Sequence, residues 1–498
     1  MAASRRFFVL STVAVVALLL AVLALARAGG SFRSDDVFLG RSGAGNADNP
    51  EAAEQGERAH ERADAFQEAV EAGTAGKQFA VAAAPAAGWA GEQLFDATAD
   101  DWEPAIAADP TGPYVYILAT RYGTTKPCPG NCPDPWIALE RSSDNGATWT
   151  DGVPLCACKG GGQFDPIIEV VPGPGTAAGY VYATYMSGYN VMFVKSTDHG
   201  ANWSAPVKVY GNVSWNDKPV LAMSNDGHDV YIPFNGPTGG DPWLAQSHDS
   251  GVTWSQTKLV NSDRYYFAFD ADVAADGTVY LGESSLLYGG GGNKGTVPSG
   301  TVDEHVFVST NIGMSFTDRL VASVQPGIAC TAAGCSPDFY LGHHALTVDA
   351  TGRIVFLYDG AATNGGLQTI AAKTSTNRGA AWSAAVQLSA TGSQATDPAV
   401  EATGSGDVRA WYAQTTGSNV DAWNVYYRTS TNGGSTWSTP VVISDATSGA
   451  AYKSASGFLE VYGDYGEIAI TSAGKTIAVW GEGTSYTGPG GVWFNRQP

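Results

Sequence analysis

Ionisable side chains recur at one position of a repeated pattern in this sequence. Nine residues before a recurring glycine stand Glu103, Lys218, Ala268, His343, Asp397 and Tyr465, and a repeat with a longer turn has Asp165 there. Further polar residues lie beside this set: Asp101, Asp217, Asp270, His344 and Asp464. Carboxylates with one or two histidines are suited to hold a sugar, a cationic group or a divalent ion. Two such carboxylates could also form the acid–base pair of a glycosidase.

A structural interpretation of the same residues stays open beside the functional one. Asp-Pro and Glu-Pro steps can begin a strand, with the carboxylate capping the turn before it. Under the functional interpretation, we expect Tyr465, Glu103 and Asp397 to be catalytic. The expected binding residues are Trp102, Asp165, Asp217, His343 and Asp464. Calcium is the one cofactor these carboxylates would suit, and the sequence contains no zinc-protease, phosphate-loop, nucleophile-elbow or calcium-loop motif.

The recurring glycine marks units of strands that must position these residues. An apolar strand precedes each glycine, and a strand of alternating aromatic and β-branched residues follows it. The seven glycines are Gly112, Gly179, Gly227, Gly277, Gly352, Gly406 and Gly474. Two more strands follow in the first six units, and four-stranded units repeated at this spacing are typical of a β-propeller. The sequence therefore predicts an all-β fold with seven blades, or six as the alternative.

A second motif, Ser-x-(Asp/Asn)-x-Gly-x-x-(Trp/Phe), falls between the third and fourth strands of six units. Its acidic or amide position is Asp144, Asp198, Asp249, Asn311, Asn377 and Asn432. The side chain can accept backbone hydrogen bonds within a turn, the Gly takes positive φ, and the aromatic residue packs on the blade. A turn tolerates the exchange of Asp for Asn, whereas a catalytic or calcium-binding carboxylate does not. Copies 51 to 66 residues apart also lie on six different blades, so the motif is predicted to be scaffold.

The seventh unit contains three strands and no fourth. The missing strand is expected from the segment GWAGEQLFDATADDWEPAI at 88–106, in which Trp89 takes the place of the motif's Trp. Pairing of this segment with the last blade would close the ring and remove exposed strand edges.

The motif and its phase with the strands resemble the Asp-box (BNR) repeat of the sialidase superfamily, over roughly residues 80–498. The resemblance implies a β-propeller. In family members that cleave sialic acid, three arginines hold the sugar carboxylate, a Tyr helped by a Glu is the nucleophile, and an Asp is the acid. Tyr465 matches the family's Tyr strand.

The arginines do not carry over to this sequence. The family's first arginine corresponds to Trp102, in Trp-Glu-Pro. The places of the second and third are occupied by Glu283-Ser284 and Gly366-Leu367. Only the planar guanidinium fork pairs with both carboxylate oxygens. We therefore expect a sialidase-like propeller that binds or processes extracellular glycans and is no true sialidase. The alternatives are an exo-glycosidase that uses the channel-mouth carboxylates and Tyr465, and a non-catalytic surface scaffold.

The N-terminus predicts export. Arg5 and Arg6 precede an apolar run at 7–26 with a small-residue cleavage pattern, so residues 1–28 read as a signal peptide or, uncleaved, a membrane anchor. Residues 29–78 form a tether with a short helix at about 50–72, and 79–498 form the propeller. A formal charge of −21 argues against nucleic acid as a partner, and the membrane is expected as a partner only through an uncleaved N-terminus.

Cysteine usage agrees with export. Six cysteines stand in three close pairs, Cys128 with Cys132, Cys156 with Cys158, and Cys330 with Cys335. An even count in an exported chain predicts disulfides. The bonding of the first four with one another is left open.

Overall fold

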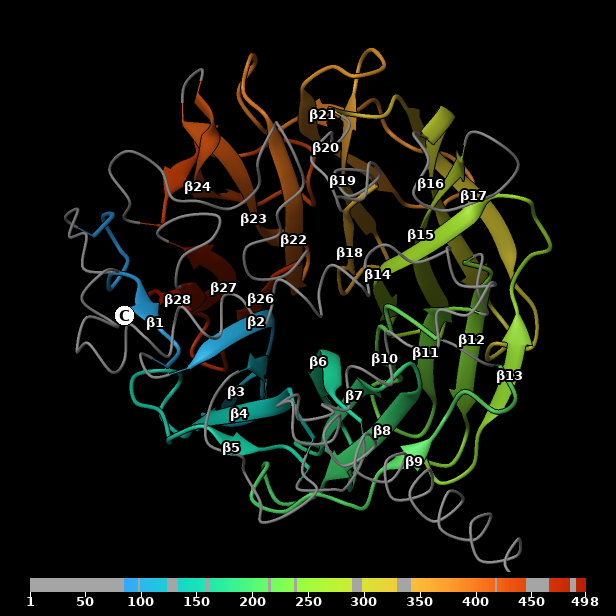
Figure 1. Ribbon diagram of the computed structural model, residues 1–498, viewed down its shortest axis with the longest axis vertical. Coiled ribbons are helices and arrows are strands. Elements are labelled where there is room, and N and C mark those ends of the chain that lie inside the picture. Colours follow the sequence, from blue (N-terminus) through green and yellow to red (C-terminus); the bar gives the residue numbers. More distant parts are fainter. Residues whose placement is uncertain are drawn as a thin grey trace, which may run out of the picture. The chain divides into compact units, whose positions relative to one another are not determined.

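A computed structural model describes residues 85–96, 99–122, 133–156, 161–213, 216–236, 240–288, 298–328, 342–416, 419–444, 465–483 and 490–498. All of them belong to one unit of the chain, Asp48–Pro498. In this part, strands form seven four-stranded sheets arranged around a central channel (Figure 1). The predicted seven-bladed propeller is confirmed, and the six-bladed alternative is wrong. The predicted signal and the helix at 50–72 lie outside the described residues.

Each blade is an antiparallel sheet whose strands run in chain order from the channel outward. Blades 1 to 3 consist of β2 (Asp100–Ala108), β3 (Val115–Tyr122), β4 (Trp136–Ser142) and β5 (Val153–Pro154); β6 (Gln163–Val170), β7 (Val181–Ser187), β8 (Val191–Ser196) and β9 (Val207–Lys208); and β10 (Ala222–Met223), β11 (Val230–Asn235), β12 (Pro242–Ser247) and β13 (Ser255–Lys258). Blades 4 to 6 consist of β14 (Tyr265–Val273), β15 (Val279–Tyr288), β16 (Pro298–Ser309) and β17 (Thr317–Val324); β18 (His344–Val348), β19 (Ile354–Ala361), β20 (Gln368–Ser375) and β21 (Val386–Gln387); and β22 (Ala395–Thr403), β23 (Asp407–Thr416), β24 (Asn419–Ser430) and β25 (Val441–Val442).

Blade 7 is made from both ends of the described chain. It contains β26 (Glu467–Ile470), β27 (Thr476–Gly483), β28 (Gly490–Arg496) and, as its outermost strand, β1 (Gln93–Leu94). Leu94 pairs with Trp493, and the N–H of Ala90 donates to the carbonyl of Arg496 at 2.9 Å. Trp89 is buried beside them, with its ring 4.9 Å from that of Tyr427 in blade 6. The segment expected to close the ring is thus part of the last sheet.

The core lies between neighbouring blades. Successive side chains of a strand point to opposite faces of its sheet, so each blade has two buried faces. Tyr116 of β3, for example, packs in one cluster with Ile168 and Val181 of blade 2, and all three are fully buried. Burial of each such side chain stabilises the fold by roughly 1.5–3 kcal/mol. The stacked blades therefore hold the inner strands at fixed positions around the channel.

The repeated motif forms the turn between the third and fourth strands. In blade 1, Ser142 Oγ and the N–H of Thr148 both donate to Asp144 Oδ1 at 2.8 Å. The hydroxyl of Thr148 donates to Asp144 Oδ2 at 2.7 Å. These hydrogen bonds all join Asp144 to residues of its own turn, as expected for a side chain that shapes a turn.

The other copies repeat this geometry. Hydrogen bonds from the side chains of Asn202 and Thr253, with further local bonds, lower the pKa of Asp198 and Asp249 to about 2. Where Asn replaces Asp, the amide donates instead: Asn311 and Asn432 each donate to the hydroxyl of the residue four positions on, at 2.9 Å. The motif therefore works with either residue.

Two consecutive residues of each turn have positive φ. The glycine does, and so does the residue before it, with φ between 55° and 60° where that residue is not Gly: Asn145, His199, Ser250, Ile312 and Arg378. Asn adopts this conformation readily, whereas a β-branched residue such as Ile312 resists it.

Candidate functional site in the central channel

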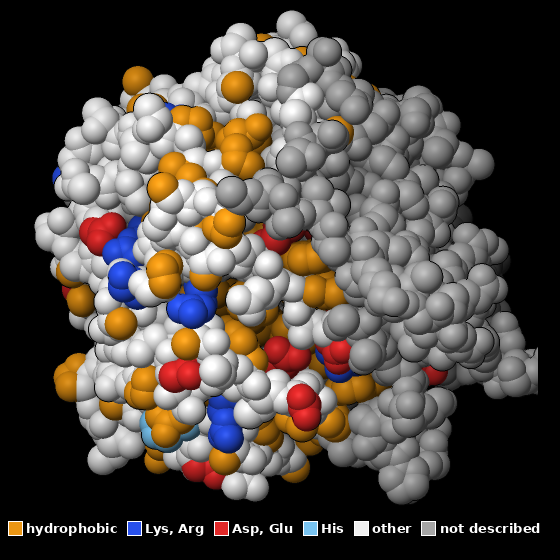
Figure 2. Space-filling view, turned by 90° about the vertical axis from the view of Figure 1, so that its left-hand side faces the viewer, with side chains coloured by type: hydrophobic (Ala, Val, Ile, Leu, Met, Phe, Trp, Pro, Cys, Tyr) orange, Lys and Arg blue, Asp and Glu red, His pale blue; other side chains and the backbone are white. Residues whose placement is uncertain are grey.

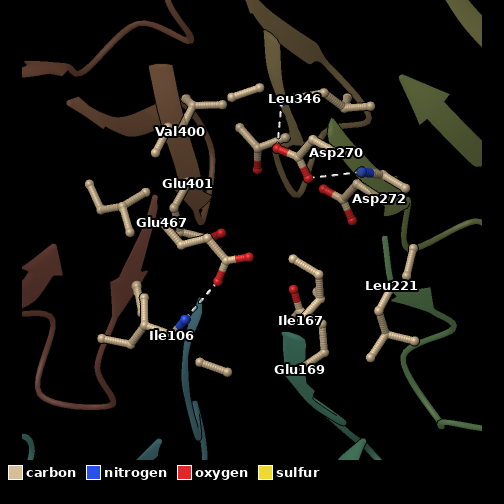
Figure 3. A pocket seen from close by; sticks show the side chains of 18 of the residues that line it. Ile106, Ile167, Glu169, Leu221, Asp270, Asp272, Leu346, Val400, Glu401 and Glu467 are labelled. Carbon is tan, nitrogen blue, oxygen red and sulfur yellow. Dashed lines mark hydrogen bonds between the residues drawn. The ribbon is translucent and has the colours of Figure 1, made fainter. Parts of the chain in front are cut away.

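The inner strands of all seven blades line one cavity of about 350 Å³ in the channel. This volume lies in the range of small-molecule binding pockets. The walls are largely aliphatic, with Ile106, Ile167, Leu221, Leu346 and Val400 among the lining residues (Figure 3). Tyr465, His343 and Asp397 line it where the inner strands begin. Three of the sequence-predicted site residues thus border the same cavity.

Besides Asp397 at the mouth, five carboxyl groups point into this cavity. They belong to Glu169 of β6, Asp270 and Asp272 of β14, Glu401 of β22 and Glu467 of β26 (Figure 3). The described residues that line the cavity include neither Lys nor Arg. The channel is therefore acidic, and its carboxyl residues are half-buried.

Three of these carboxyl groups also tie neighbouring blades together. Asp270 accepts from the N–H of Leu346, and Asp272 from the N–H of Val348, both at 2.7 Å. Glu467 accepts from the N–H of Ile106, again at 2.7 Å. An inner strand leaves backbone N–H groups unpaired on its channel side, and such groups need a partner. The carboxyl groups of the adjacent blade supply that partner.

Glu169 and Glu401 differ from the other three. Glu169 is approached only by the N–H of its own neighbour Val170, and no hydrogen bond from a described residue reaches the Glu401 carboxyl group. Both face the cavity (Figure 3). They are the two carboxyl groups that no inner-strand contact explains.

Burial changes the acidity of the whole set. Desolvation raises the pKa of Asp270 to about 8 and that of Asp272 to about 6. It raises the pKa of Glu169, Glu401 and Glu467 well above the usual value, and repulsion from the neighbouring carboxylates adds to the effect. At neutral pH the channel therefore retains protons that the same groups would lose in water.

Tyr465 lies at the mouth beside three predicted site residues. Its hydroxyl is 3.5 Å from the carbonyl of Pro166, and burial, followed by the charges of Asp165, Glu103, Glu467 and Asp217, raises its pKa well above the usual value. The sequence-predicted residues of blades 1, 2, 3 and 7 are therefore close enough to act on one phenol.

Glu103 and the equivalent residues of other blades are buried where the inner strands begin. Glu103, with no exposed surface, accepts from the hydroxyl of Thr120 at 2.6 Å and from the N–H of Asp165 at 3.0 Å. Glu103, Asp165, Lys218 and Asp397 all precede proline and have φ between 47° and 54°. This conformation is costly for residues other than Gly, Asn and Asp and is concentrated at functional sites. The structural and the functional interpretation thus apply to the same residues.

His343 is held by carboxylates at the same mouth. Its Nδ1 lies 3.1 Å from Asp359 Oδ2 and 3.3 Å from Asp397 Oδ1. Thr396 Oγ1 donates to Asp359 and lies 3.1 Å from the same ring nitrogen. The ring of Phe269 lies 4.8 Å from that of His343. Asp359, which lies in β19, the second strand of blade 5, was not predicted from the sequence.

Other predicted residues are placed differently. Trp102 is 1% exposed and packs against Tyr122 with ring centroids 5.1 Å apart, so its indole belongs to the interior of blade 1. His344 also lines the cavity, but its ring lies 3.2 Å from Glu304 on the blade side, and burial lowers its pKa to about 3. Asp464 lies outside the described residues.

A hydrogen-bonded Ser–His–Asp chain crosses blade 4. Ser285 Oγ lies 3.0 Å from His305 Nε2, and His305 Nδ1 lies 2.8 Å from Asp318 Oδ1. The connectivity is that of a nucleophile, base and orienting acid. Ser285, however, has no exposed surface, and Arg264 Nε donates to its Oγ at 2.8 Å. The chain therefore ties three strands together.

Period-two alternation is the signal that could have found the missed carboxyl groups. Asp272 stands two residues after Asp270, which the sequence analysis had named, and Glu169 and Glu401 each follow the predicted Asp of their strand by four residues. Alternate residues of a strand share a face, so a mouth residue implies channel-facing residues further along.

For metals and membranes, the described ranges give two findings. They contain no group of three or more His, Cys, Asp or Glu side chains placed to hold a metal ion. None of their helices is long and apolar enough to cross a bilayer.

No protein-family model and no curated protein matches the sequence. Among solved structures, the chain is similar to a protein of unknown function from Dyadobacter fermentans, with 11% identity, a TM-score of 0.47 and coverage of 82% of this chain and 98% of that one. It is similar to a PL25 ulvan lyase bound to a saccharide, with 11% identity, a TM-score of 0.48 and coverage of 82% and 95%. It is also similar to the intramolecular trans-sialidase from Ruminococcus gnavus, with 12% identity, a TM-score of 0.42 and coverage of 84% and 98%. At these values the likeness is no guide to what this chain binds, so its own residues must support any functional proposal.

Proposed function

We propose that this protein is an exported, sialidase-like propeller that binds an extracellular glycan in its central channel. One observation carries the proposal: a cavity of about 350 Å³ combines aliphatic walls, the rings of Tyr465 and Phe269, and five carboxyl groups. Sugars bind through hydroxyl hydrogen bonds to such groups and through stacking of their apolar faces on aromatic rings. Export rests on the N-terminal signal sequence and the paired cysteines.

Sialic acid is a poor fit for this channel. Its carboxylate would lie in an acidic cavity with no cavity-lining Lys or Arg among the described residues to pair with it. Burying an unpaired charge is costly, and every proton that the channel loses adds repulsion. This agrees with the absence of the family's arginines from the corresponding places in the sequence.

A glycoside hydrolase is the second candidate, favoured by the mouth residues. A Tyr nucleophile is known among sialidases, and Tyr465 lies within the influence of the carboxylates of Asp165 and Glu103. His343 between Asp359 and Asp397 offers a proton carrier at the same mouth.

The test incubates the full chain with a mixed oligosaccharide library and follows products by mass spectrometry, with and without added calcium. Retention of particular glycans without cleavage is the expected result. New shorter products would establish the hydrolase instead. If the protein neither retains nor cleaves any glycan, a surface scaffold remains as its function.

Tyr465→Phe separates binding from catalysis. If the channel only binds, this variant should retain glycans to within a few fold, because only a hydroxyl is lost. If Tyr465 is the nucleophile, cleavage should fall by at least about 10³-fold. Tyr412→Phe, which removes the hydroxyl that donates to the carbonyl of Leu388 at 2.8 Å inside blade 6, is the matched control and should leave both properties unchanged.

A further inference from the structure

We infer that the sugar unit bound in the channel carries a protonated amine, as a hexosamine with a free amino group does. This inference rests on the proposed function, and it names the chemical class of the ligand. It depends on the placement of charge in and around the cavity.

The channel concentrates carboxyl groups that no basic side chain lining it balances. On the described part of the face in Figure 2, acidic and basic side chains are interspersed. In the cavity, five carboxyl groups meet without a lining Lys or Arg. Arg409 lies across from Glu401 in the strand register, but its guanidinium is paired with Asp407 at 3.0 Å and donates to the carbonyl of Gly474. Lys218 is buried at its strand start and is not a lining residue.

Glu169 and Glu401 are the groups available to a ligand. Asp270, Asp272 and Glu467 each accept a backbone N–H of the next blade, which fixes their orientation. Glu401 has no such bond and Glu169 only a local one, yet both are enclosed by protein and aimed into the cavity (Figure 3). An enclosed carboxyl group without a partner is costly to keep and is stabilised by a cationic one.

An ammonium group fits these surroundings better than the alternatives. It can donate three hydrogen bonds, so it can bridge carboxyl groups that come from different strands. The rest of a hexosamine is a ring with an apolar face, for which Tyr465 and Phe269 supply aromatic surface at the mouth end. An N-acetyl group cannot provide the charge, and an anionic sugar would be repelled.

Binding of the amine should be coupled to proton release. The titratable groups that face the cavity are Glu169, Asp270, Asp272, Glu401 and Glu467, with Tyr465, His343 and Asp397 at the mouth. Burial raises the pKa of Asp272 to about 6 and that of Asp270 to about 8. It raises the pKa values of Glu169, Glu401 and Glu467 well above the usual value. A cation displaces these protons, so affinity should rise with pH as long as the ligand amine keeps its own proton, which is up to about pH 7, and should fall above that.

The experiment measures binding by calorimetry with fully deacetylated glucosamine oligosaccharides, their N-acetylated counterparts and neutral glucose oligosaccharides, at pH 5.5 and pH 7. We expect the free amine to bind at least about tenfold more tightly than the other two, with a larger margin at pH 7. Measurements in buffers of different ionisation enthalpy should show protons released on binding. Calcium chloride alone tests the competing occupant.

Variants assign the effect to the channel. Glu169→Gln and Glu401→Gln should each weaken amine binding at least about tenfold and leave neutral-sugar binding unchanged. Asp276→Asn, on the surface opposite Arg378, is the matched control and should change neither. Melting curves verify that every variant is folded, and Asp272→Asn provides a second test if one Glu variant is not.

The outcomes separate the inference from the proposed function. Equal or tighter binding of N-acetylated or neutral sugars would overturn the inference and leave the proposed function standing. Tight calcium binding that amines cannot displace would also overturn it. Failure of every carbohydrate to bind would overturn the proposed function together with the inference.

Discussion

At the scale of single residues, the repeated turns differ in how well their residues suit the backbone. Ile312 has a φ of 60° and is 51% exposed, whereas Asn145 occupies the equivalent place in blade 1 at 59°. The left-handed conformation costs an ordinary residue roughly 1–2 kcal/mol, and Asn is among the residues that tolerate it. Ile312→Asn should therefore raise the free energy of unfolding by about 1 kcal/mol, as measured by urea denaturation.

Val252→Asn is the control for this prediction. Val252 is 64% exposed in the corresponding turn of blade 3, so the substitution removes a similar apolar surface without relieving backbone strain. The urea midpoint of Val252→Asn should equal that of the wild type within experimental error. Equal stabilisation by both variants would attribute the effect to apolar exposure and contradict the backbone explanation.

At the scale of strands, one guanidinium group links the segment that follows β1 to blade 1. Arg121 of β3 binds Asp101 at 2.7 and 2.9 Å, and its NH1 lies 2.8 Å from Asp96, which follows β1. Arg121 is 4% exposed, and burial together with nearby carboxylates raises the pKa of Glu140 beside it to about 9. Removing one partner from a buried ion pair leaves an uncompensated charge.

Arg121→Ala should therefore lower the free energy of unfolding by at least about 3 kcal/mol, as measured by urea denaturation. The exposed pair Arg378–Asp276, also 2.8 Å long, supplies the contrast: Arg378→Ala should leave the unfolding midpoint unchanged. If Arg121→Ala is as stable as wild type, the guanidinium does not hold the closing strand.

Sequence patterns predicted the strands better than the site. Strand units in phase with Gly112 and its counterparts, and the resemblance of the Trp89 segment to a fourth strand, are local patterns, so blade number and ring closure could be read from them. The cavity depends on how far the inner strands of seven blades lie from one another. Asp397 reaches His343 only because blades 5 and 6 pack together, and no spacing in the sequence encodes that distance.

At the scale of the whole molecule, the acidic channel sets how stability depends on pH. Asp270 has its pKa raised to about 8 in the fold, against an unfolded value near 4, so between these pH values the folded state holds more protons. Stability from this group is therefore greatest at low pH and falls as pH rises toward 8. Asp198 and Asp249 act in the opposite sense: their pKa values are lowered to about 2, so their contribution is lost as pH falls below 4.

The melting temperature should consequently be highest at mildly acidic pH, near 4 to 6, and decline toward pH 8. Glu169→Gln should raise the melting temperature at pH 8 more than at pH 5, because the amide needs no proton to be neutral. A scan of melting temperature against pH for both proteins checks this. A wild-type profile that rises steadily to pH 8 would contradict the role given to the channel.

The composition of blade 7 also governs the order of events during synthesis. Leu94 emerges from the ribosome long before its partner Trp493, so the first strand to be made is among the last to be paired. Six blades can stack as they appear, but the ring stays open with an unpaired edge until β28 arrives. In the exported chain that we propose, the early segment would have to be kept from false partners throughout transit. Folding speed is then limited by the meeting of two distant segments, more than by any single blade.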